Sequence, residues 1–479
     1  MRPAGVAVKP DVTPVAGTPT LLLGGFDLGE AGYVAQEFFV SGTASSFAPD
    51  SEPGQDGRWS VTPKDTAEYT TRIVVLTPAD PARFNGTALV EWLNVSGGID
   101  APAVWMMAHR EVLRAGYAYV TVSAQKVGVD GGQNLLGFDL SLKSQNPTRY
   151  AALSHPGDAF AYDIFSQIGD LVRDSGADGV LGGVTAEHVI ALGESQSAMF
   201  LTTYINAVDP LVEAYDGFLV HSRLGPVGPL DSSSIFDELQ NASAAPAVKF
   251  RPDLRVPLMA IITETDLYGA GRQGYYGARQ PDHDLLRVWE IAGAAHADNY
   301  TIQVAAIDSG SAPLEALVAA WAPTDNLMGQ QLEHFINFGP QHHYVVQASL
   351  AALDTWVRTG APPPSGPPLT VRDSNHRDGH PEPVLDAHGI AEGGVRTPWV
   401  DVPIARTTGV TSDENIMAAI FGSGEPFDDA TLQRLYPGGA EDYVASFTDA
   451  LDRAIQSGFI LAADREEILQ LAAASYPGR

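Results

Sequence analysis

The chain of 479 residues is long enough for two to three ordinary domains or for one large, elaborated domain. Its 44% hydrophobic and 18% charged residues provide material for a core and exclude a disordered chain. The net charge of −30 repels nucleic-acid phosphates and anionic lipids, which excludes polyanion binding as a main role. The lack of cysteine excludes disulfides, thiolate nucleophiles and cysteine-ligated metal centres.

The sequence shows no sign of membrane insertion or export. It contains no run of about 18 apolar residues, the length that a membrane-spanning helix needs. Residues 1–5 lack the apolar run of a signal peptide. We therefore expect a soluble, cytoplasmic protein without a membrane partner, unless an export signal has been removed from the start of the chain. The oligomeric state is not predicted by any pattern in the sequence.

Residues 1–86 indicate β structure. Residues 33–40 alternate in polarity and are bounded by turn-forming residues, and the apolar run 73–76 ends before Pro78. We expect this segment to be a β-rich extension of the domain that follows.

From residue 87 onward, apolar strands alternate with helical periods. This pattern predicts an α/β fold with a mostly parallel central sheet and helices on both faces, which we place at residues 87–360. The predicted strands are 88–93, 117–122, 188–192, 218–220, 256–263 and 286–291, and the predicted helices are 102–115, 160–171, 197–207 and 345–358.

Two segments depart from this alternation. Residues 297–344 are too long for a structureless loop, so we expect an inserted lid with a helix around 314–321. The proline-rich stretch 361–368 predicts a stiff connector to a partly helical C-terminal subdomain, 361–479. We expect this subdomain to pack on the preceding domain near its site, with Trp399 buried there.

The segment Gly193-Glu194-Ser195-Gln196-Ser197 follows a short apolar strand and opens a helix. This is the setting of a nucleophile elbow, a tight turn that raises a serine hydroxyl above the edge of a sheet. The pattern is G-x-S-x-S, with Ser197 at the position of the usual second glycine. The alternative is a serine that merely caps a helix.

A serine nucleophile needs a histidine base and an acid that orients it, and on such a fold they follow in the order serine, acid, histidine. One predicted strand ends at Glu264-Thr265-Asp266, and the next is followed by a small-residue loop that ends at His296. We expect Ser195, Asp266 and His296 to form the triad. Glu264 is the alternative acid, and Asp266 is preferred because its short side chain suits a buried bond to the imidazole.

The backbone N–H of Gln196 is the expected first donor of an oxyanion hole. The second is expected from the loop 94–98, with Val95 and Ser96 as the candidate donors. The alternative is that the glycines of this loop form only a turn.

Other polar residues at predicted strand ends are candidates for contacting substrate. Asn94 follows the first strand of the alternating pattern, and His221 and Arg223 follow the strand after the elbow helix. We expect His221 and Arg223 on the rim of the site.

No cofactor or metal is expected. Gln341-His342-His343 and Asp282-His283-Asp284 lack a third ligand at helical spacing. Neither a phosphate-binding loop nor a dinucleotide fingerprint is present.

The chain resembles the bacterial alpha/beta-hydrolase domain-containing proteins, a family of large serine esterase-like enzymes. The stretches that carry the resemblance are 90–98, 122–129, 155–158, 162–167, 193–197, 216–223, 263–266, 293–298 and 394–399. Serine in place of the second elbow glycine is usual in this family. The resemblance implies an alpha/beta-hydrolase fold and serine-dependent hydrolysis of an ester, without indicating a particular substrate.

The sequence thus favours a carboxylic-ester hydrolase that acts on a small-molecule ester through an acyl-enzyme. An acyltransferase would use the same acyl-enzyme, with an alcohol or amine in place of water. A non-catalytic binding scaffold is the third hypothesis, which the ordered serine, acid and histidine disfavour.

Overall fold

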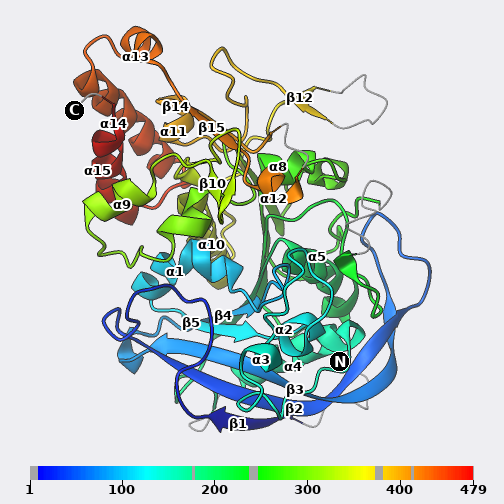
Figure 1. Ribbon diagram of the computed structural model, residues 1–479. Coiled ribbons are helices and arrows are strands. Elements are labelled where there is room, and N and C mark those ends of the chain that lie inside the picture. Colours follow the sequence, from blue (N-terminus) through cyan, green and yellow to red (C-terminus); the bar gives the residue numbers. More distant parts are fainter. Residues whose placement is uncertain (1–8, 175–178, 237–245, 373–380, 412–414, 478–479) are drawn as a thin grey trace.

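A computed structural model describes residues 9–174, 179–236, 246–372, 381–411 and 415–477. The central feature of these residues is a nine-stranded sheet with the order β1-β2-β3-β5-β4-β6-β7-β8-β9 (Figure 1). Its strands are β1 (Asp11–Val15), β2 (Tyr33–Pro49), β3 (Val61–Pro78), β4 (Thr87–Trp92), β5 (Ala118–Val122), β6 (His188–Glu194), β7 (Gly217–His221), β8 (Leu258–Thr263) and β9 (Leu286–Ile291).

The six strands from β4 to β9 pair with one another only in parallel. Their residues are almost all buried, as expected where helices cover both faces of a sheet. The predicted mostly parallel sheet is therefore confirmed, and the predicted strands agree with the observed ones to within two residues at each end.

One face of the sheet is covered by α1 (Ala103–Ala115) and α10 (Gln341–Thr359), and the other by α4 (Ala161–Arg173) and α5 (Gln196–Thr203) (Figure 1). Gly116 and Gly360 end α1 and α10 in the left-handed conformation. The predicted helix 197–207 continues beyond α5 as a π-helical turn at Tyr204–Val208. Further α-helices among the described residues of this region are α2 (Lys126–Asp130), α3 (Leu142–Gln145), α6 (Asp209–Val212) and α8 (Glu264–Tyr268).

The N-terminal region forms a long antiparallel ribbon of β2 and β3, and β3 joins the parallel strands through β5. These two strands are longer than the predicted runs. The first half of β3 was not predicted because it is polar and largely exposed. Backbone pairing with β2, rather than an alternating apolar pattern, holds that half in the sheet. Residues 1–5, which bear on the question of an export signal, lie outside the described residues.

The segment 297–344 contains α9 (Leu314–Ala320), close to the helix expected around 314–321, and a short hairpin of β10 (Asn326–Leu327) and β11 (Gln330–Gln331). Asn337 N–H donates to the carbonyl of Phe421, which joins this segment to the C-terminal region. No helix among the described residues is long and apolar enough to cross a membrane.

The C-terminal region contacts the last strand of the sheet. The connector 361–368 comes after α10 in the chain and lies beside β9. Trp289 Nε1 of β9 donates to the carbonyl of Pro364 in the connector over 2.9 Å. Val395 then pairs with Ile291 as a parallel bridge at the sheet edge. The elements of this region are β12 (Val371–Arg372), β13 (Glu382–Pro383), α11 (Pro398–Asp401), β14 (Ala405–Thr408), α12 (Ile416–Ile420), β15 (Ser423–Pro426), α13 (Asp429–Leu435), α14 (Ala440–Gln456) and α15 (Arg465–Ser475).

Trp399 is partly buried between the C-terminal helices and the helical layer of the sheet. Its ring stacks on Tyr344 of α10 at 5.6 Å and meets Phe447 of α14 edge-on at 5.5 Å. Tyr344 also belongs to the apolar cluster of α13, α14 and α15. The C-terminal helices therefore complete their small core with a residue from α10.

Candidate active site

Ser195 stands at a strained turn between β6 and α5. Its φ of 56° and ψ of −119° lie where residues other than glycine are rare, and such a conformation costs about 1–3 kcal/mol. A Cβ atom at Gly193 would lie 3.0 Å from the carbonyl oxygen of Ser197, a tight contact that favours glycine there. The N–H of Ser195 donates to the carbonyl of His221 at the end of β7 over 2.9 Å. These features fit the expected nucleophile elbow, and the turn is called the elbow below.

Ser197 ties this turn together. Its Oγ donates to the carbonyl of Glu194 over 2.7 Å and accepts the N–H of the same residue over 3.1 Å. Both polar groups of the backbone before Ser195 are thereby satisfied inside a buried turn. This explains why a serine can occupy the position of the usual second glycine.

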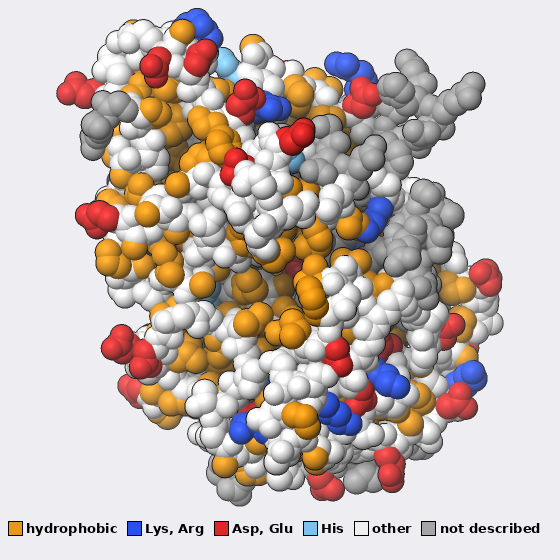
Figure 2. Space-filling model, viewed as in Figure 1, with side chains coloured by type: hydrophobic (Ala, Val, Ile, Leu, Met, Phe, Trp, Pro, Cys, Tyr) orange, Lys and Arg blue, Asp and Glu red, His pale blue; other side chains and the backbone are white. Residues whose placement is uncertain are grey.

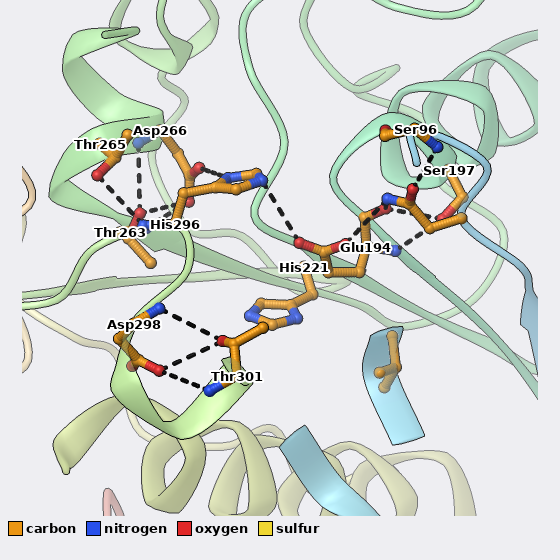
Figure 3. A network of polar contacts seen from close by, with 12 residues as sticks. Ser96, Glu194, Ser197, His221, Thr263, Thr265, Asp266, His296, Asp298 and Thr301 are labelled. Carbon is orange, nitrogen blue, oxygen red and sulfur yellow. Dashed lines mark hydrogen bonds and ion pairs between the residues drawn. The ribbon is translucent and has the colours of Figure 1, made fainter. Parts of the chain in front are cut away.

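His296 and Asp266 come together from the ends of two neighbouring strands. Asp266 Oδ1 lies 2.6 Å from His296 Nδ1 (Figure 3). Asp266 Oδ2 accepts the N–H and the hydroxyl of Thr263 over 2.8 and 2.7 Å, in a capping box at the start of α8. The buried carboxylate is therefore fixed, and it orients the imidazole with its other nitrogen away from α8.

Glu264, the alternative acid, makes no hydrogen bond or ion pair with His296 among the described residues. Its buried carboxylate accepts the N–H of Gly293 over 2.6 Å, the hydroxyl of Thr408 over 2.6 Å and the N–H of Gly409 over 2.9 Å. These bonds join the C-terminal region to the sheet. The geometry therefore favours Asp266 over Glu264 as the orienting acid.

The other nitrogen of His296 faces a residue that the sequence did not single out. Nε2 lies 3.6 Å from Oε1 of Glu194, the residue directly before Ser195 (Figure 3). Among the described residues no hydrogen bond joins His296 to Ser195 Oγ. An acidic residue at the last position of the strand before the elbow was the signal that could have identified Glu194.

The two carboxylates change the protonation of the site. Burial lowers the pKa of His296, but Asp266 and Glu194 together raise it to about 9. Burial raises the pKa of Glu194 to about 7, even though His296 lowers it. In the free protein the two carboxylates therefore favour the imidazolium form of His296.

The loop 94–98 lies against the elbow. The N–H of Val95 donates to Oε1 of Gln196 over 3.4 Å, a long bond that a substrate oxygen could replace. The N–H of Ser96 donates to Oδ1 of Asn94 over 2.8 Å. As the first residue of α5, Gln196 has a backbone N–H without an acceptor inside the helix. Val95 and Gln196 are thus the better placed donors, because the N–H of Ser96 is held in a short bond whereas the bond of Val95 is long.

Two of the three candidate substrate contacts, Arg223 and His221, do not lie on the rim, and the third, Asn94, contacts Glu194. Asn94 Nδ2 donates to Oε2 of Glu194 over 3.1 Å and to its carbonyl over 3.2 Å, so Asn94 holds Glu194. Arg223 is fully buried and donates to the carbonyls of Leu224, Gly225 and Val248. The prediction of Arg223 on the rim is therefore wrong, because its guanidinium is used to satisfy loop carbonyls inside the core.

His221 is also fully buried rather than on the rim, which corrects that prediction. Its Nε2 lies 2.8 Å from Nε2 of His342, and Nδ1 of His342 lies 3.6 Å from Oδ2 of Asp298. Burial lowers the pKa of His221 far below its usual value, and His342 and His296 lower it further. His221 is therefore neutral and shapes the floor of the elbow through its carbonyl. Within the described residues no three histidine, aspartate or glutamate side chains are grouped to hold a metal ion.

Figure 2 shows a hollow in the middle of the face that Figure 1 presents, bordered by hydrophobic side chains. In that view the hollow lies beside α5, the helix that Ser195 precedes. An apolar depression with a few polar groups at its base is the usual form of a small-molecule site.

The sequence profile of the alpha/beta hydrolase domain family matches residues 3–470. The chain belongs to this family. No curated protein matches the chain. Among solved structures it is similar to a glucuronoyl esterase from Solibacter usitatus, with 10% identity, 60% of this chain and 82% of that chain covered, and a TM-score of 0.31.

Two further structures show a likeness of the same kind. Acetyl xylan esterase 1 from Thermoanaerobacterium is 10% identical over 59% of this chain and 81% of that chain, with a TM-score of 0.30. An esterase from the fungus Rhizomucor miehei is 12% identical over 55% of this chain and 77% of that chain, with a TM-score of 0.28. These scores are low, so the family match and the strand topology define the alpha/beta-hydrolase fold of this chain.

Proposed function

We propose that this alpha/beta hydrolase is a serine-dependent carboxylic-ester hydrolase. The observation that carries the proposal is the positive-φ turn at Ser195, which follows β6 at the sheet edge where Asp266 holds the imidazole of His296. A strained serine backbone beside an oriented imidazole is the arrangement that nucleophilic acyl transfer requires.

In the proposed reaction Ser195 Oγ attacks the ester carbonyl carbon, and His296 Nε2 accepts the hydroxyl proton. Asp266 keeps Nδ1–H oriented and stabilises the imidazolium. The negative oxygen of the tetrahedral intermediate accepts hydrogen bonds from the backbone N–H groups of Gln196 and Val95. The alcohol leaves with the proton from Nε2. Water then attacks the acyl-enzyme while Nε2 accepts its proton, and Ser195 Oγ takes that proton as the carboxylic acid is released.

Two further features support an ester as substrate. The hydrophobic border of the hollow suits an apolar acyl or alcohol group (Figure 2). The acidic residues that surround His296 favour an uncharged substrate over an anionic one, because Glu194 and Asp266 already place negative charge there.

A panel of p-nitrophenyl esters of increasing acyl length tests the proposal. We expect the wild-type protein to hydrolyse at least one of them and Ser195→Ala to lose at least about 10³-fold of kcat. The variant should keep its fold, since the partly exposed hydroxyl makes no hydrogen bond within the described chain. Hydrolysis no faster than that of Ser195→Ala on every ester would contradict the proposal.

A further inference from the structure

The imidazole of His296 has a carboxylate at each nitrogen. Nδ1 is bonded to Asp266 at 2.6 Å, and Nε2 lies 3.6 Å from Oε1 of Glu194 (Figure 3). In the function proposed above, Nε2 is the atom that takes the proton of Ser195. Glu194 therefore lies next to the one nitrogen that must lose its proton before the reaction can begin.

The position of Glu194 is fixed from two sides. It is the last residue of β6, so its backbone is part of the sheet. Its other carboxylate oxygen accepts Nδ2 of Asn94 over 3.1 Å, and Asn94 in turn accepts the N–H of Ser96. The loop that lies over the elbow therefore holds this carboxylate toward His296, and a merely solvated acid would have no such support.

The charges around the pair favour a proton on His296. The titratable and charged groups that face Glu194 or His296 from neighbouring elements are Glu91 on β4, His221 on β7, Asp266 on α8 and Arg272 in the loop that follows α8. His221 is neutral because of its burial, and Arg272 opposes the charge on His296. The carboxylates of Asp266 and Glu194 outweigh Arg272 and keep the imidazolium form in the free protein.

We propose that Glu194 is a positioning residue that pairs with the Nε2–H of the His296 imidazolium and so sets the pH above which His296 acts as the general base. The proposal rests on the esterase function proposed above. The same carboxylate stabilises the imidazolium that forms again when Ser195 attacks. Glu194 therefore raises the pH at which the enzyme becomes active and increases the rate that it reaches there.

Glu194→Gln tests this, because it removes the charge and keeps an amide that can still pair with Asn94. Glu194→Asp keeps the charge on a shorter side chain. Glu187→Gln is the matched control, since Glu187 is exposed and directly precedes the opposite end of β6. The titration of the His296 imidazole is followed by NMR in each protein. Its signal is assigned as the one that is absent from the spectrum of His296→Gln. The pH profile of kcat/KM on a p-nitrophenyl ester is measured in parallel.

We expect Glu194→Gln to lower the pKa of His296 by about one unit or more and to shift the acidic limb of kcat/KM by the same amount toward lower pH. The plateau of kcat/KM should also fall. Glu194→Asp should restore part of the pKa, and Glu187→Gln should match the wild type.

An unchanged His296 titration in Glu194→Gln would overturn the proposal, as would an equal shift in Glu187→Gln. If Glu194→Gln does not fold, a Glu194→Asp titration equal to that of the wild type, together with an unshifted kcat/KM profile, would also overturn it. Failure of the esterase function would be seen separately, as wild-type protein without ester hydrolysis whose His296 titration nevertheless depends on Glu194.

Discussion

Thr408 Oγ1 donates a hydrogen bond of 2.6 Å to Oε2 of Glu264, although the two residues are 144 positions apart in the chain. Glu264 opens α8, the short helix that also carries Asp266. The N–H of Gly409 donates to the same oxygen over 2.9 Å. The C-terminal region is therefore bonded to the helix that supplies the proposed catalytic acid.

Removal of the C-terminal region tests how far the site depends on it. A fragment of residues 1–360 lacks the donors of Thr408 and Gly409 and leaves a buried carboxylate with fewer partners, which costs about 1–3 kcal/mol or more. It also uncovers the apolar residues that α14 and α15 cover, including Tyr344. We expect an aggregating or inactive fragment, measured by soluble yield and ester hydrolysis. A soluble 1–360 fragment with full activity would refute this dependence.

The two acids of α8 should respond differently to loss of charge. Asp266→Asn removes the group that holds His296 Nδ1, and such a loss reduces turnover by about 10⁴-fold while the fold persists. The measurement is kcat on the best p-nitrophenyl ester, with thermal unfolding as the check on the fold. The assignment of Asp266 would fail if Asp266→Asn kept more than about a tenth of wild-type kcat.

Glu264→Gln is the counterpart on the same helix. An amide cannot accept all three donors that now meet the carboxylate, so we expect a lower Tm and a loss of about 1–3 kcal/mol of unfolding free energy. Turnover per folded molecule should fall far less than in Asp266→Asn. The reverse order of the two variants in kcat would exchange the roles of the two acids.

The residues of the candidate site could be proposed from the sequence where short motifs and their order along the chain point to them. The strand before Ser195 and the small-residue loop before His296 are local patterns, and the serine-acid-histidine order is read directly along the chain. These residues lie where parallel strands end. The choice between Asp266 and Glu264 was not local. It depends on Thr408 and Gly409, which are remote in sequence and occupy the carboxylate of Glu264, while the capping box that holds Asp266 is itself local.

Two errors of the sequence analysis arise because tertiary contacts decide the positions of the residues concerned. Arg223 follows a strand end, as a rim residue would, but it is stacked between Phe250 and Tyr275 at 4.7 and 5.1 Å. Those aromatic residues come from segments that the sequence could not place near it. Residues 61–68 were missed as part of a strand because pairing with β2, and not hydrophobic periodicity, keeps that polar segment in the sheet.

Glu91 should make stability depend on pH. It is fully buried on β4, where it accepts the N–H of Val104 and the hydroxyl of Tyr119, each over 2.6 Å. Burial raises its pKa from 4.5 to about 8. The folded protein therefore binds a proton that the unfolded chain has lost between these pH values, and the stability from this group falls as the pH rises through that range.

Glu91→Gln removes that titration and keeps both contacts, because its amide can accept the N–H of Val104 and donate to the oxygen of Tyr119. We expect the stability of the variant relative to the wild type to increase between pH 5 and pH 9. The change in unfolding free energy is on the order of a few kcal/mol, and the Tm difference between the two proteins should increase with it. Thermal unfolding across that range measures it. A difference that stays constant with pH would contradict the assignment of a raised pKa to Glu91.

Arg72 should support the loop over the elbow. Its buried guanidinium lies 2.9 Å from Asp100, just beyond the loop 94–98, and donates to Ser123 over 3.2 Å. Arg72→Met leaves the Asp100 carboxylate buried without its cation, which costs about 3–5 kcal/mol. We expect a lower Tm and a reduced kcat, with part of the stability recovered when Asp100→Asn is added. Equal Tm values for the single and double variants would show that the ion pair is not the cause.

The central claim is that Ser195 is a nucleophile activated by His296, and its most direct test is covalent labelling with a fluorophosphonate followed by mass spectrometry. We expect the wild-type protein to gain one adduct, located on the peptide that contains Ser195. Ser195→Ala should gain none, and His296→Gln should react at least about 10³-fold more slowly. An adduct on another residue, or a wild-type protein that does not react, would contradict the claim.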